Sequence, residues 1–122
     1  MTKITLTWLA IICFFCHSCM KNENAQLIIG EWQAISWLVD NQMSDYQVSS
    51  TSFTFDEKGD YTFNYDGTKT AGDFKVEHDM LFTTVEGQQE IMVKIAKLNQ
   101  DTLVFDMNRG GQNELMTLVR KK

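Results

Sequence analysis

Apolar and polar residues alternate along most of the chain after residue 30, with the period of two that is typical of β-strands. Turn-forming Gly, Asn and Asp residues separate these runs, which recur about every ten residues. The eight predicted strands cover residues 31–39, 51–55, 61–65, 70–77, 80–85, 90–98, 102–107 and 114–120. Because every connection but the first is short enough for a hairpin, we expect an all-β, eight-stranded, antiparallel up-and-down barrel, which leaves no strand edge exposed.

The first predicted strand carries large side chains on both of its faces. Strict alternation places Trp32 and Ala34 on one face, and Ile35 and Trp37 on the other. The polar residues 40–50 then form the one long connection in the chain. This run therefore predicts a strand in which the two tryptophans point in opposite directions.

Local signals add a helix and a bulge to this pattern. A short helix is predicted over residues 22–29, capped by Asn22 or Asn24 and ended by Gly30. Gly72 interrupts the fourth strand, where an isolated glycine is typical of a β-bulge.

The first residues have the features of a secretory signal. Lys3 supplies positive charge, and residues 4–15 form an apolar stretch shorter than the roughly 20 residues of a membrane-spanning helix. Small Ser18 precedes Cys19. This ending resembles the lipoprotein signals of Gram-negative bacteria, which implies that residues 1–18 are removed and that Cys19 carries a lipid.

That resemblance implies a domain organisation and a location. We expect a signal peptide at residues 1–18, a lipid-anchored tether at 19–25 and a barrel domain at 26–122. The partner of the tether would be a membrane of the bacterial cell envelope, and we expect the outer membrane.

The predicted helix leads into Gly30-Glu31-Trp32, which resembles the Gly-x-Trp motif of the lipocalins. Further stretches resemble the lipocalin-like domain of small bacterial lipoproteins: Phe53–Asp56, Gly59–Phe63, Gly72–Phe74, Ile95–Leu98, Asp101–Val104 and Thr117–Arg120. The resemblance implies a lipocalin-like barrel. It also implies that Trp32 lies at the closed barrel end, covered by Arg120 in a structural cation–π contact.

Composition and charge narrow the chemistry. The chain is 43% hydrophobic with a net charge of −5, and no basic stripe with interleaved aromatics predicts nucleic-acid binding. Cys13, Cys16 and Cys19 have a spacing seen in metal sites, but they lie among Ile, Phe and Leu, as signal-peptide residues do. His78 and the acidic residues 56–60 are interpreted as turn residues rather than as a catalytic base and a calcium site. We therefore expect a monomer that is not an enzyme and needs no metal or cofactor.

Large aromatic side chains are the remaining signal, because an eight-stranded barrel has room for packed side chains or for one small ligand. The candidate pocket residues are Trp37, Phe53, Phe55, Tyr61, Phe63, Tyr65, Phe74, Phe82 and Phe105. Met43 and Tyr46, from the long connection, are candidate lid residues. The alternative interpretation of the same rings is that they only fill the core.

Two functional hypotheses follow. The first is a membrane-anchored, non-catalytic module that binds a small hydrophobic ligand. The alternative is an envelope interaction or inhibitor protein with a filled barrel and no ligand. Residues 65–72 loosely resemble a loop of lipoproteins that inhibit lysozyme, although a hairpin turn explains the same residues.

Overall fold

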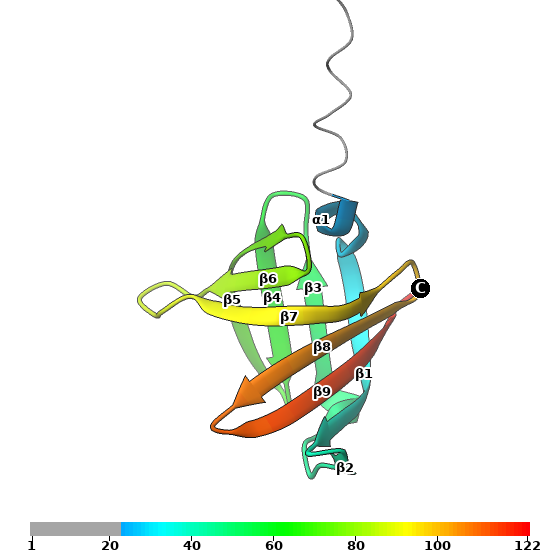
Figure 1. Ribbon diagram of the computed structural model, residues 1–122. Helices are drawn as coiled ribbons and strands as arrows, with labels where there is room; N and C mark the ends of the chain where they lie inside the picture. Colours follow the sequence, from blue (N-terminus) through cyan, green and yellow to red (C-terminus); the bar gives the residue numbers. More distant parts are fainter. Residues whose placement is uncertain (1–22) are drawn as a thin grey trace, which may run out of the picture.

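Eight long antiparallel strands close into a barrel in the computed structural model, which describes residues 23–122 (Figure 1). The signal peptide expected at residues 1–18, Cys19 and the start of the expected tether lie outside these residues. The elements are α1 (Glu23–Leu27), β1 (Gly30–Val39), β2 (Gln42–Met43), the 3₁₀-helix η2 (Val48–Ser50), β3 (Thr51–Phe55), β4 (Asp60–Tyr65), β5 (Thr68–Glu77), β6 (Met80–Thr84), β7 (Ile91–Leu98), β8 (Thr102–Arg109) and β9 (Gln112–Arg120). Within the described part of the chain, no helix is long and apolar enough to cross a membrane.

The predicted up-and-down topology is confirmed. From β3 to β9 each strand pairs antiparallel with the next along the chain, and β1 pairs with both β3 and β9, which closes the barrel. The two-residue strand β2 was not predicted, because it lies within the polar connection and pairs only with the end of β1. Asp40 and Asn41 form the turn between β1 and β2 with φ of 52° and 67°, a backbone that Asn and Asp tolerate and that suits a tight hairpin.

A bulge in β1 overturns the predicted orientation of Trp37. Ala34 pairs with Leu118 and Ser36 with Thr117, so Ile35 has no partner of its own in β9. One extra residue reverses the alternation that follows it. As a result Trp32 and Trp37 are both buried, at 0% and 5% exposure, whereas Ile35 is 56% exposed.

Gly72 does not form the predicted bulge. It pairs in register with Tyr61, in an uninterrupted ladder between β4 and β5. A Cβ atom at this position would collide with the carbonyl oxygen of Thr84 and lie 3.1 Å from the ring of Tyr61. Glycine is therefore required here because another backbone approaches closely, which is its second common use in a strand.

The core occupies the barrel interior, where alternate residues of each strand point inward. The buried apolar residues are Ile28, Trp32, Ala34, Trp37, Phe55, Tyr61, Val76, Leu81, Ile95, Leu103, Phe105, Met116 and Leu118. Ile28 enters from the segment after α1, which lies over one end of the barrel, while β2 lies at the other end (Figure 1).

Arg120, the last residue of β9, closes the barrel end beneath α1. Its guanidinium carbon lies 4.2 Å from the ring centroid of Trp32, which is the contact implied by the family resemblance. Arg120 Nη1 and Nη2 donate to the carbonyl oxygens of Ile29 and Leu27 at 2.7 and 2.6 Å, and Nε donates to that of Gln100 at 2.6 Å. One side chain thus joins the α1 segment, β9 and the β7–β8 turn.

Replacing Arg120 with Met should lower the free energy of unfolding by about 2–4 kcal/mol, because charge-assisted hydrogen bonds and the cation–π contact are lost together. Arg120→Lys should restore only part of the lost stability. An ammonium group lacks the planar fork of N–H donors with which the guanidinium reaches three carbonyl oxygens. Urea unfolding measures both variants.

Lys121→Met is the matched control. Lys121 forms an exposed ion pair with Glu31 at 3.7 Å, and its loss should cost less than about 1 kcal/mol. Equal destabilisation by Lys121→Met and Arg120→Met would show that Arg120 is not the residue that holds this end together.

Candidate functional site

An apolar cavity of about 150 Å³ lies inside the barrel at the end away from α1. Ile91, the first residue of β7, and Arg109, the last of β8, both line it, and the opposite ends of these two strands lead to the turn that Arg120 contacts. The full lining is Trp37, Phe53, Tyr61, Phe63, Leu81, Thr83, Ile91, Val93, Phe105, Met107, Arg109 and Met116. Because Arg120 and Trp32 fill the α1 end, the barrel can open only at this other end.

Five of the nine aromatic residues singled out in the sequence line this cavity. They are Trp37, Phe53, Tyr61, Phe63 and Phe105. The ring of Phe53 stacks on Phe63 at 4.6 Å and meets Phe105 edge-on at 5.4 Å. The rings therefore fill most of the barrel by packing on one another and leave a small space between them.

Phe55 lies deeper, toward the α1 end, and does not line the cavity. It is 1% exposed, stacks on Phe53 at 5.7 Å and meets Phe74 edge-on at 4.9 Å. Its role is to fill the core between the cavity and the α1 end.

Phe82 points out of the barrel. Its neighbours Leu81 and Thr83 are buried and line the cavity, so the intervening side chain faces outward. There its ring lies 5.3 Å from Nζ of Lys75, the residue paired with it on β5. The sequence could not decide the face of this strand, because Met80, Leu81 and Phe82 place apolar side chains on both sides.

The long first connection covers one side of the cavity mouth. The ring of Tyr46 stacks on Trp37 at 4.0 Å, and Tyr65 meets Trp37 edge-on at 6.1 Å. The backbone N–H of Gln47 donates to the hydroxyl of Tyr65 at 3.3 Å, which ties the connection to β4. Met43, in contrast, is 82% exposed. Tyr46 is thus a covering residue and Met43 is not.

An ion pair at the mouth, between a buried glutamate and an exposed arginine, was not anticipated. Glu114 is 2% exposed, and its Oε1 accepts a hydrogen bond of 2.9 Å from Nε1 of Trp37. Arg109 Nη1 lies 3.7 Å from the same oxygen. The signal in the sequence is that Glu114 is in phase with Met116 and Leu118, which both point inward, although a glutamate near a strand end usually lies at the surface.

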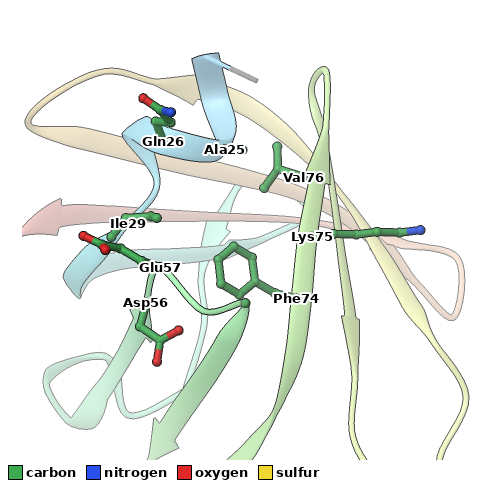
Figure 2. Close-up of a pocket in the computed structure, with 9 residues that line it drawn as sticks. Ala25, Gln26, Ile29, Asp56, Glu57, Phe74, Lys75 and Val76 are labelled. Atoms are coloured by element: carbon green, nitrogen blue, oxygen red, sulfur yellow. The ribbon is translucent and has the colours of Figure 1, made fainter. Parts of the chain in front are cut away.

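A second hollow lies outside the barrel, between α1, the β3–β4 turn and β5 (Figure 2). It measures about 790 Å³ and is lined by Ala25, Gln26, Ile29, Asp56, Glu57, Gly59, Phe74, Lys75 and Val76. Figure 2 shows Phe74 pointing into it and Lys75 pointing away. Despite its size it is a wide groove with a mixed polar lining, so the more apolar barrel cavity is the better candidate for a small apolar ligand.

The remaining candidate residues, Asp56 and His78, lie in turns between strands. The carboxylate of Asp56 accepts hydrogen bonds from the backbone N–H groups of Lys58 and Asp60 at 2.9 and 3.0 Å, as a turn residue does. His78 has a φ of 57° in the β5–β6 turn, and its carbonyl oxygen accepts from Asn24 Nδ2 at 2.8 Å. Among residues 23–122, no group of three His, Cys, Asp or Glu side chains could hold a metal ion.

The chain is similar to known lipocalin-like proteins in sequence and in fold. The model of a lipocalin-like domain family matches residues 28–105. A crystal structure of a lipocalin-like protein from Bacteroides uniformis is similar with a TM-score of 0.57 and 17% identity, covering 78% of this chain and 98% of that one. An uncharacterized protein from Bacteroides eggerthii gives a TM-score of 0.57 at 15% identity, covering 77% and 99% of the two chains. No curated protein sequence matches significantly.

The buried hydrogen bond between Trp37 and Glu114 can be separated from the charge of Glu114. Glu114→Ala leaves the indole N–H without an acceptor in a buried site and should lower the free energy of unfolding by about 1–3 kcal/mol. Glu114→Gln keeps an acceptor oxygen and should cost less than half as much. Urea unfolding of both variants tests this, and a Gln variant as unstable as the Ala variant would contradict it.

Proposed function

We propose that this chain, which belongs to the lipocalin-like domain family, binds one small hydrophobic molecule in the cavity of its barrel. The observation that carries the proposal is the cavity itself, whose lining is almost entirely apolar and includes five aromatic rings. An apolar space favours an apolar ligand, because the ligand and the lining lose contact with water together.

The volume limits the size of the ligand. A cavity of about 150 Å³ is below the 300–1,000 Å³ of pockets for drug-sized molecules. A dry apolar cavity of roughly 150 Å³ in another protein accepts benzene. The ligand of this barrel is therefore a single ring or a short chain rather than a long lipid.

The proposed role is non-catalytic. At the mouth, Glu114 pairs with Arg109 and accepts a hydrogen bond from Trp37, and neither charged group is a nucleophile beside a base. Sequestration or delivery of the ligand is the activity that such a site supports.

We further propose that the barrel is tethered to an envelope membrane through a lipid on Cys19. Only residues 20–22 separate Cys19 from α1, a reach of about 10 Å when extended. Because α1 lies at the closed end, this tether would hold that end near the membrane and leave the cavity mouth on the aqueous side. A ligand would then enter from water rather than from the bilayer.

The alternative of an interaction or inhibitor protein with a filled barrel has less support. Residues 65–72, the segment that resembles an inhibitor loop, are paired along β4 and β5 around a tight turn at Asp66 and Gly67. The hairpin offers no long protruding loop. A barrel that binds no ligand at all would restore this alternative.

Thermal unfolding of the full chain with a panel of small aromatic and short-chain compounds tests ligand binding. A ligand at ten times its Kd should add about 1.4 kcal/mol, which raises the Tm of a domain this size by several degrees. Val93→Phe, which fills part of the cavity, should abolish the shift.

Val104→Phe is the matched control, since Val104 lies on the outer face of β8 between the buried Leu103 and Phe105, and this variant should keep the shift. The proposal fails if no compound raises the Tm, or if Val93→Phe responds as the unmodified chain does.

Cys19→Ala should move the protein from the membrane fraction to the soluble fraction of the cells that make it, because the lipid attachment point is gone. The mass of the mature N-terminal peptide should also show a lipid on Cys19 in the unmodified protein. A Cys19→Ala protein that remains in the membrane fraction would rule out this anchor.

A further inference from the structure

The mouth of the cavity carries an inward-facing charge that an apolar ligand alone does not use. Along β8 the side chains of Phe105, Met107 and Arg109 alternate toward the interior, and all three line the cavity. Arg109 is the last of this row and its side chain is 55% exposed. A guanidinium group therefore stands where the apolar cavity meets water.

Glu114 positions this guanidinium without using up its donors. Glu114 Oε1 already accepts the indole N–H of Trp37, and within residues 23–122 every buried side-chain nitrogen or oxygen has a hydrogen-bond partner. Arg109 has five N–H donors, and its contact with Glu114 at 3.7 Å is longer than a hydrogen bond. The carboxylate is thus engaged in the protein, while the guanidinium retains donors for a ligand.

We propose that the ligand is a small apolar monocarboxylate, whose tail fills the cavity and whose carboxylate is bound by Arg109. This inference rests on the proposed function and names the class of its ligand. A guanidinium presents two parallel N–H groups to one carboxylate, which gives stronger and better oriented bonds than a neutral donor. The tail is one ring or a chain of about five to seven carbons, as the cavity volume of about 150 Å³ requires.

Acidic residues at this end limit the negative charge that the ligand can carry. The mouth-side turns carry the exposed acidic residues Asp45, Asp66, Glu86 and Glu90. Their repulsion is screened over about 10 Å at 0.1 M salt, so a monoanion in contact with Arg109 is tolerated. A dianion would leave its second charge unpaired beside buried Glu114.

Matched ligands separate head-group recognition from cavity filling. Isothermal titration of the full chain compares phenylacetate with 2-phenylethanol and 2-phenylethylamine, and hexanoate with hexanol. At least one carboxylate should bind ten-fold or more tightly than its alcohol, and the amine should bind most weakly. The better of the two carboxylates distinguishes an aromatic from an aliphatic tail.

The variants assign the preference to Arg109. Arg109→Gln should weaken carboxylate binding ten-fold or more while changing alcohol binding less than three-fold, and Arg109→Lys should recover part of the loss. Lys69→Gln, which removes an exposed cation near the start of β5 at the same barrel end, should leave both affinities unchanged. Circular dichroism checks that each variant is folded.

The outcomes distinguish this inference from the proposed function. If alcohols bind as tightly as carboxylates, or if Arg109→Gln keeps the carboxylate preference, the inference is wrong and the cavity binds neutral molecules. If none of these compounds binds, both the inference and the proposed function are overturned. A preference that Lys69→Gln also abolishes would show a general surface charge effect and would equally overturn the role of Arg109.

Discussion

The contact between Arg120 and Trp32 determines which end of the barrel is filled and which end can hold a cavity. A guanidinium 4.2 Å from the indole centroid, with hydrogen bonds to three carbonyl oxygens, joins the last strand to the segment that precedes the first. An eight-stranded barrel has two ends, and one of them is filled by this contact and by Ile28. Any cavity inside the barrel must therefore lie toward the other end, and the tether that we propose would start at the filled end.

The cavity is what remains when aromatic side chains fill a narrow barrel from one end. Phe55 and Phe74 pack near α1, and Phe53 and Phe63 stack on each other farther from it. Trp37 lies where β1 pairs with β9. The rigid rings leave a space of about 150 Å³ that they cannot collapse to fill. The same rings thus fill most of the core and line the cavity in which we propose that a ligand binds.

Much of the fold could be predicted because it depends on local alternation and turn chemistry. The strand order and the closure of the barrel follow from eight runs of period two joined by Gly, Asn and Asp turns. The short helix was predicted separately, from the residues that precede Gly30. The site was less predictable. One bulged residue, Ile35, turned Trp37 inward, and Phe82 faced outward because its strand has apolar side chains on both faces. Glutamate usually lies at the surface, and the burial of Glu114 is explained only by its hydrogen bond with Trp37, 77 positions away.

The sequence by itself determined the class of the molecule, an antiparallel up-and-down barrel, and its resemblance to the lipocalins implied the contact between the Gly-x-Trp tryptophan and a late arginine. The strands are encoded in short stretches, because alternation and turn chemistry act between neighbouring residues. Only the tertiary structure decided where the cavity lies, how large it is and which charged groups stand at its mouth. These properties depend on residues from different strands that meet across the barrel, and on a single-residue bulge that no periodicity reveals.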